Sequence, residues 1–122
     1  MRTDQPNLIV DLTFEFALKI IEFTELLEEK RKFNMANQLF RSGTSIGANT
    51  REAQNAESKS DFIHKLKIAA KEADETTYWL LLCHRSKKYP NPESLLDEIE
   101  SINKVLSKII ASSKRANSKS TN

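Results

Sequence analysis

The stretch QLFRSGTSIGANTREA, residues 38–53, decides the fold of this chain of 122 residues. It contains the only two glycines of the sequence, Gly43 and Gly47, inside a segment whose apolar residues recur at helical spacing. A glycine in the interior of a helix costs about 1 kcal/mol relative to alanine. Two glycines four residues apart in one helix therefore indicate a place where another backbone comes close.

Helical periodicity extends from this stretch in both directions. Apolar residues recur at alternating steps of four and three in four segments, which is the spacing of one face of an α-helix. Asp11, either Ser58 or Ser60, and Asn91 before Pro92 are the predicted N-terminal caps. The predicted core positions are Phe16, Ile20, Phe23, Leu27, Met35, Leu39, Ser42, Ile46, Asn49, Ala53, Ala56, Phe62, Leu66, Ala69, Ala73, Thr76, Leu80, Cys83, Leu95, Ile99, Ile102, Leu106 and Ile109.

Four such helices with short connections predict an all-α fold, an antiparallel up-down-up-down four-helix bundle. We expect a flexible N-terminus at 1–8 and the bundle at 9–111. A disordered basic tail is expected at 112–122, because this segment is rich in Ser, Lys and Asn. Pro90 and Pro92 argue against one continuous coiled coil.

The composition is that of one soluble domain. Charged residues make up 30% of the chain, and the net charge of +2 is too small to indicate nucleic-acid binding by itself. The single cysteine, Cys83, excludes an internal disulfide and fits a reducing compartment, so we expect a cytoplasmic protein. No apolar run reaches the length of a membrane span, and no membrane partner is expected.

Polar residues occupy core positions in the middle of the second helical segment. Ser42 and Asn49 stand where the other helices have Leu or Ile, and a buried asparagine needs hydrogen-bond partners. Strips beside this seam and on the next helix predict a polar network of Arg41, Ser42, Asn49, Glu52, Lys65 and Glu72. The network is either a small polar pocket or a set of groups that satisfy each other and specify the packing, and we favour the second interpretation.

Two features indicate packing beyond a single helix face. Gly43 and Gly47 share a flank with Phe40, which fits either a close contact with a neighbouring helix or a subunit contact. The end of the third segment, 78–83, is apolar nearly all round, which favours oligomerisation over cover by the following loop. The candidate subunit interface comprises Phe40, Gly43, Gly47, Tyr78, Leu81 and Leu82.

The sequence lacks the patterns that catalysis and metal binding require. There is no pair of Glu-x-x-His units, no Arg–His nuclease element, no glycine-rich phosphate loop, no zinc-ligand spacing and no nucleophile elbow. Cys83 falls on the apolar seam, as a core residue does. We therefore expect no enzyme activity, no cofactor, no metal and no small-molecule substrate.

A basic strip provides a nucleic-acid interpretation of the surface. Its candidate contacts are Arg51, Lys59, Lys67 and Lys71, each of them modest and salt-sensitive. A solvated helix face explains the same residues equally well.

Residues 38–49 with Glu52-Ala53 resemble the signature of the bacterial four helix bundle protein family, also called the S23 or 23S rRNA intervening-sequence protein family. The resemblance spans roughly residues 9–110 and continues through 61–62, 65–69, 71–73, 75–76 and 78–80. This family is related to the accessory variability determinant proteins of diversity-generating retroelements. The resemblance implies a small all-α bundle that forms a ring-like homopentamer, and it transfers no catalytic residue.

These observations lead to one functional hypothesis and one alternative. The hypothesis is a non-enzymatic, self-associating bundle that acts as a scaffold or adapter, with weak binding of RNA or another nucleic acid. The alternative is a protein–protein interaction module without a nucleic-acid role, such as an accessory subunit of a reverse transcriptase.

Overall fold

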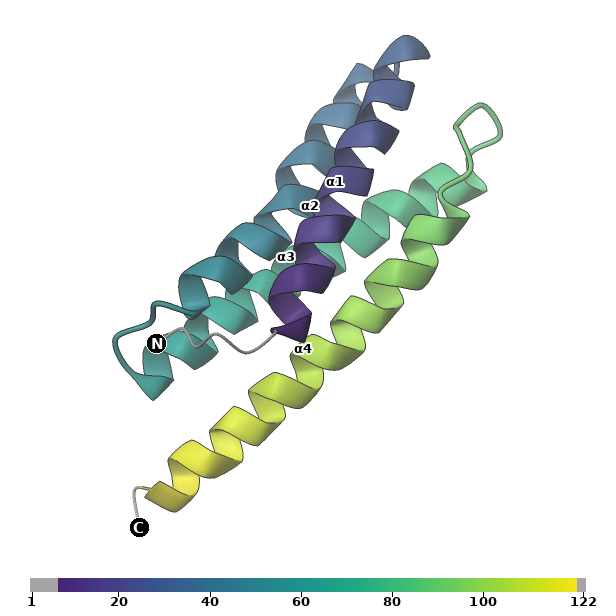
Figure 1. Cartoon of the computed structure of the whole chain (residues 1–122). Coiled ribbons are helices and arrows are strands. Elements are labelled where there is room, and N and C mark those ends of the chain that lie inside the picture. The colour runs from purple at the N-terminus through teal and green to yellow at the C-terminus, as the bar shows by residue number, and fades with distance from the viewer. Residues whose placement is uncertain (1–6, 121–122) are drawn as a thin grey trace.

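The computed structural model describes residues 7–120, and the side chains of 7–116. This part of the chain contains four helices and no strand, which confirms the predicted all-α class (Figure 1). The helices are α1 (Leu8–Glu29), α2 (Phe33–Ala53), α3 (Lys59–Arg85) and α4 (Glu93–Ser120).

The helices form an antiparallel bundle in which each packs on its neighbour in the sequence and α4 packs back on α1. No close backbone approach joins α1 to α3 or α2 to α4 within residues 7–120, so each of these pairs lies on a diagonal of the bundle. Each short connection reverses the chain, and α1 and α3 therefore run in the same direction (Figure 1).

Most of the core positions that the periodicity predicts are buried. Phe16, Ile20 and Leu27 of α1 are completely buried, as are Leu66 and Leu80 of α3. Phe62 and Ile109, at the ends of their seams, are only partly buried. Burying one such side chain stabilises a fold by about 1.5–3 kcal/mol, so these positions carry the fold.

The buried face of α2 is rotated relative to the prediction. Thr50 is completely buried whereas Asn49 is only half-buried, and Ala36 is buried in place of Met35. The predicted core position of Asn49 is therefore wrong. The reason is that α2 comes close to α1 at Gly43 and Gly47, so its buried face turns towards α1 and away from the predicted seam.

Two of the helix starts follow the predicted capping chemistry and one does not. The Ser58 hydroxyl accepts the backbone N–H of Asp61 at 3.0 Å, and the Asn91 side chain accepts that of Glu93 at 3.0 Å. Helix α1 begins earlier than expected, because Asn7 and not Asp11 is its cap. The rest of the predicted flexible N-terminus, residues 1–6, lies outside the described residues.

Helix α4 continues past the end of the predicted bundle. It runs to Ser120, and Ser113 is only 8% exposed. This differs from the disordered tail expected from residue 112. The segment 112–120 contains no glycine and no proline that would stop a helix, and its first turn still packs on the bundle.

The two glycines lie where α1 and α2 approach each other. A β-carbon on Gly43 would stand 2.9 Å from Cγ1 and Cγ2 of Ile20, and one on Gly47 would stand 3.2 Å from the backbone oxygen of Thr13. Both distances are shorter than ordinary van der Waals contact between such atoms. Residues 38–53 thus contain a close approach of α2 to α1.

Candidate functional site

The predicted polar strip between α2 and α3 is present and is centred on Arg41. Its guanidinium bonds to Glu72 at 3.3 Å and also to Glu75. Glu75 in turn accepts the indole N–H of Trp79 at 3.0 Å. The periodicity did not single out Glu75, although its place three residues after Glu72 on the same helix edge was a usable signal.

A second ion pair joins the two helices closer to their connecting loop. Lys65 Nζ lies 3.0 Å from Glu52 Oε1, and this hydrogen-bonded carboxylate raises the pKa of Lys65. The pair is partly exposed, as are the Arg41 pairs. Ion pairs in such surroundings contribute little to stability, typically below about 1 kcal/mol.

The remaining predicted members do not join these ion pairs. Ser42 is completely buried and hydrogen-bonds to Thr76 at 2.9 Å in the core. The Asn49 side chain donates to the backbone oxygen of Ser45 in its own helix at 2.9 Å, so its predicted role between helices is wrong. The structure brings together Arg41 with Glu72 and Lys65 with Glu52, but it does not connect all six residues.

This arrangement supports the packing interpretation of the polar strip over a ligand pocket. Among the described side chains, every buried polar atom has a hydrogen-bond partner. No group of His, Cys, Asp and Glu in the same part of the chain has a geometry that fits a metal ion. Cys83 is buried, and burial raises the pKa of its thiol to about 11, so its nucleophilic thiolate is scarce at neutral pH.

The predicted subunit interface divides into two parts. Gly43 is buried against Ile20, and Gly47 faces Thr13 of the same chain, so their assignment to a subunit interface is corrected to a contact within the bundle. The other members are exposed: Phe40 49%, Tyr78 57%, Leu81 46% and Leu82 37%. The loop after α3 does not cover them. Its Tyr89 packs against the core instead, and Lys32 Nζ lies over the Tyr89 ring, 5.0 Å from the ring centroid.

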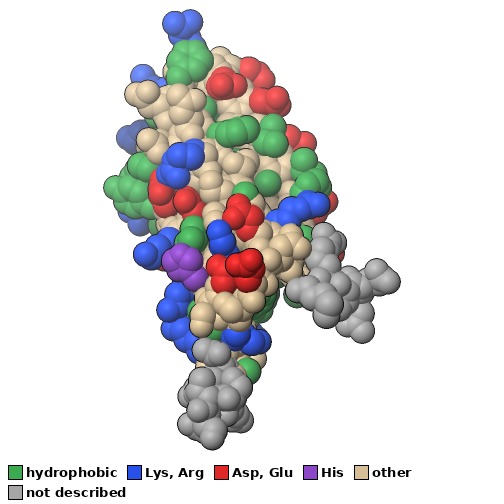
Figure 2. Space-filling view, turned by 90° about the vertical axis from the view of Figure 1, so that its left-hand side faces the viewer, with side chains coloured by type: hydrophobic (Ala, Val, Ile, Leu, Met, Phe, Trp, Pro, Cys, Tyr) green, Lys and Arg blue, Asp and Glu red, His purple; other side chains and the backbone are tan. Residues whose placement is uncertain are grey.

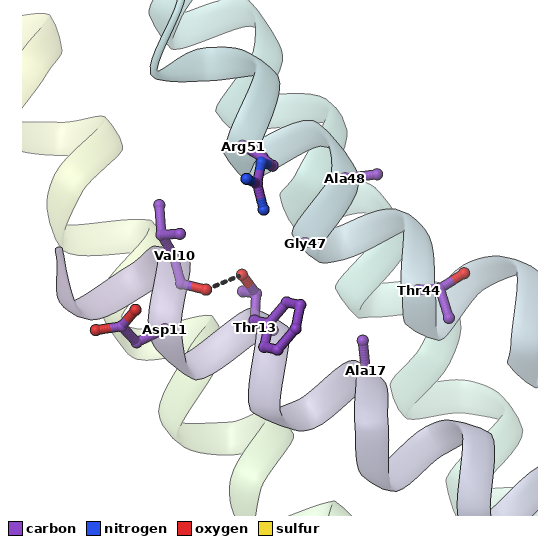
Figure 3. A pocket seen from close by; sticks show the side chains of 9 residues that line it. Val10, Asp11, Thr13, Ala17, Thr44, Gly47, Ala48 and Arg51 are labelled. Atoms are coloured by element: carbon purple, nitrogen blue, oxygen red, sulfur yellow. Dashed lines mark hydrogen bonds between the residues drawn. The ribbon is translucent and has the colours of Figure 1, made fainter. Parts of the chain in front are cut away.

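A shallow groove follows the outer side of the α1–α2 contact (Figure 3). It has a volume of about 420 Å³ and is lined by the small side chains of Ala17, Thr44 and Ala48 and by Gly47, with the charged Asp11 and Arg51 toward one end (Figure 3). The small side chains leave the groove open along both helices. Arg51 therefore lies beside α1, and the structure separates it from the predicted nucleic-acid contacts on α3.

Two of the other predicted nucleic-acid contacts form a cluster with α4. The ammonium groups of Lys67 and Lys114 are in contact, and this repulsion, with a smaller contribution from Lys71, lowers the pKa of Lys67. Lys59 lies near the start of α3 over the Phe62 ring. The sequence placed Lys114 in the predicted basic tail beside this strip but not among the four candidate contacts, although no acidic residue follows Glu100.

The fold and the site define a class: a small antiparallel four-helix bundle with a satisfied core, apolar side chains on two outer helix faces, and segregated surface charge. A family model described as 23S rRNA-intervening sequence protein matches residues 6–109. The chain belongs to this family.

A solved structure gives the same result in three dimensions. It is the crystal structure of a protein with unknown function from the S23 ribosomal protein family of Bacteroides thetaiotaomicron. The two chains are 47% identical with a TM-score of 0.79, over 84% of this chain and 97% of the other. Comparison with curated proteins gives no match. In the described residues, no helix has the length and apolar character needed to cross a membrane.

Proposed function

We propose that this protein is a non-enzymatic scaffold or adapter that works as a homo-oligomer in the cytoplasm. The observation that carries the proposal is the exposure of large apolar side chains on two outer helix faces. Phe14 and Leu18 are 53% and 44% exposed on α1, and Tyr78 and Leu82 are 57% and 37% exposed on α3. Exposed apolar patches of this kind mark interaction sites in soluble proteins.

The absence of enzyme activity is part of the same proposal. In the described residues, every buried polar side-chain atom has a hydrogen-bond partner, and burial raises the pKa of the Cys83 thiol to about 11. A site for acid–base or nucleophilic chemistry needs groups whose pKa is tuned towards neutrality in a cavity. The described residues offer satisfied ion pairs on a partly exposed edge instead.

Light scattering coupled to size exclusion tests the self-association. We expect a mass several times the 14.0 kDa of one chain, and about five times that mass for the pentamer that the family resemblance implies. A single species of one-chain mass at micromolar concentration overturns the proposal. The matched variants Phe14→Ser and Lys104→Ser, both at exposed helix positions, separate a specific apolar contact from a general surface effect.

A second candidate function is RNA binding, favoured by the contact between Lys67 and Lys114 beside Lys71. Ammonium groups held together without a carboxylate partner are neutralised well by phosphate. The family description, which refers to an intervening sequence of 23S rRNA, fits this reading. The expected result is retention of structured RNA that falls steeply with salt and is lost in Lys67→Glu/Lys71→Glu.

The alternative to RNA is a protein partner, such as a polymerase for which the bundle is an accessory subunit. In a pull-down, a protein that stays bound after nuclease treatment supports this alternative. Loss of all bound material on nuclease treatment supports the RNA candidate.

A further inference from the structure

The outer faces of α1 and α3 point to opposite sides of the bundle. The two helices lie on a diagonal, since no close backbone approach joins them. Both outer faces are exposed, and both carry large apolar side chains, Phe14 and Leu18 on α1 and Tyr78 and Leu82 on α3. A single chain therefore has two different exposed apolar faces. Because they lie on opposite sides of the bundle, they cannot contact each other within one molecule.

The charges on these two faces are opposite. The exposed ionisable residues on the outer face of α1 are Asp11, Glu15, Glu22, Glu25 and Glu29. The one lysine of α1, Lys19, turns away towards α4, where it bonds to Glu98 at 2.9 Å. The exposed face of α3 carries His64, Lys67, Lys71 and Arg85, with Asp74 as its acidic member. In the space-filling view several acidic side chains gather at the upper right edge, whereas Lys and Arg follow the left edge and the lower end (Figure 2).

The acidic residues of α1 and the basic residues of α3 also lie at matching positions along the bundle axis, which we call their heights. Ser42 bonds to Thr76 of α3, and the adjacent Gly43 touches Ile20 of α1, so Ile20 and Thr76 are level with each other. Because α1 and α3 run in the same direction, equal steps from these two residues reach equal heights.

Such steps bring three acidic residues of α1 level with three basic residues of α3. The pairs are Asp11 with Lys67, Glu15 with Lys71, and Glu29 with Arg85.

We propose that the outer face of α1 in one copy of the chain docks on the outer face of α3 in a second copy. This inference rests on the proposed self-association and names its surfaces. In the contact, acidic and basic residues of equal height meet. The exposed apolar residues of each face are covered, with Phe14 and Leu18 at different heights from Tyr78 and Leu82. The carboxylate of Asp11 from the second copy supplies a counter-charge that the Lys67–Lys114 contact lacks among the described side chains.

This pairing has a defined symmetry. Because the two faces differ, the interface is heterologous, and every copy keeps one free face for the next copy. Because paired charges stand at equal height, successive copies need no shift along the helix axis. Such an interface closes into a ring if the rotation between successive copies closes, and otherwise it continues as an open filament. The same pairing covers Lys67 and Lys71, so it excludes RNA from this face in the assembled state.

Charge reversal on each face tests the pairing. The α1 variant is Glu15→Lys/Glu29→Lys, and the α3 variant is Lys71→Glu/Arg85→Glu. Each places like charges opposite each other in the contact, and we expect each to raise the dissociation constant of the oligomer at least about tenfold. Combining all four changes in one chain restores opposite charges, and we expect a return to within about threefold of the original value. The control reverses the exposed α4 pair, Glu100→Lys/Lys104→Glu, and leaves the mass unchanged.

The outcomes separate the inference from the function that it rests on. If the unaltered protein is a single chain in solution, both are overturned. If it is an oligomer but the four-residue combination stays dissociated, only the α1–α3 pairing is overturned. If an α3 variant keeps its oligomeric mass but loses salt-sensitive RNA retention, the pairing is also overturned. The outer face of α3 then binds RNA and not a second copy of the chain. Circular dichroism spectra matching the unaltered protein establish that each variant is folded.

Discussion

The hydroxyl groups of Thr76 and Ser42 meet 2.9 Å apart in the core, between α3 and α2. The Thr76 oxygen also lies 2.7 Å from the backbone oxygen of Glu72. A hydroxyl has one proton to donate, so when Thr76 donates to the carbonyl, Ser42 donates to Thr76. A buried position that would suit a leucine is thus used for a hydrogen bond that fixes the height of α2 against α3.

We expect the two sides of this bond to respond differently to mutation. Thr76→Val removes both hydrogen bonds and leaves the Ser42 hydroxyl buried, which costs about 1–3 kcal/mol of unfolding free energy. Ser42→Ala leaves Thr76 with its carbonyl partner and costs less, on the order of 0.5–1.5 kcal/mol. Urea denaturation measures both. Equal losses in the two variants would contradict the shared-proton arrangement.

The Gly43 contact predicts a substitution that destabilises despite favouring the helix. Gly43→Ala gains about 1 kcal/mol of helix propensity, but its β-carbon would stand 2.9 Å from two carbons of Ile20. Overpacking of this kind costs about 1–3 kcal/mol, so we expect a net loss. A double-mutant cycle with Ile20→Ala checks the cause. The penalty of Gly43→Ala should disappear in the Ile20→Ala background, and a penalty that persists there would show that another contact is responsible.

The turn between α1 and α2 predicts a stabilising substitution. Arg31 has a φ of 64°, and Lys32 N–H donates to Leu27 O at 2.8 Å while Arg31 N–H donates to Glu28 O at 2.9 Å. This is a Schellman motif, whose left-handed residue is usually glycine. Because a side chain there costs about 1–2 kcal/mol, we expect Arg31→Gly to raise the unfolding free energy by about 1 kcal/mol. The control Arg31→Ala keeps a β-carbon and should show no such gain in thermal or urea unfolding.

The buried thiol predicts a pH dependence of stability. The pKa of Cys83 is raised by burial from 9.0 to about 11 in the folded chain. The folded state therefore holds a proton that the unfolded state releases. Stability from this group is complete below pH 9 and is lost as the pH rises towards 11, by about 2–3 kcal/mol in total.

Other groups titrate in the same range, so the measurement needs a matched variant. The difference in unfolding free energy between the original chain and Cys83→Ala should shrink as the pH rises from 9 to 11. A difference that stays constant over this range would contradict the raised pKa. At neutral pH the thiol should react with a disulfide reagent only on unfolding.

The sequence predicts the helix seams well, since their apolar residues must face one core whatever the details of packing. Its errors have physical causes. The capping choice between Asn7 and Asp11 depends on where the first turn docks. One heptad seam does not describe α2, because its glycines bring it close to α1. Arg31 gives no local signal for a left-handed turn, because the usual glycine is absent. The use of Gly43 and Gly47 within the chain, and not between chains, becomes visible only once Ile20 and Thr13 are placed.

The close approach of α1 and α2 at these glycines has a consequence for how the chain acquires its structure. The contact joins helices that are neighbours in sequence, so closing it costs little chain entropy. By contrast, the contact between α4 and α1 is the smallest of the four contacts between neighbouring helices. We expect amide protons of α4 to exchange with solvent before those of α1 and α2. During synthesis, the N-terminal hairpin emerges first from the ribosome, already able to pair before the last helix has been made.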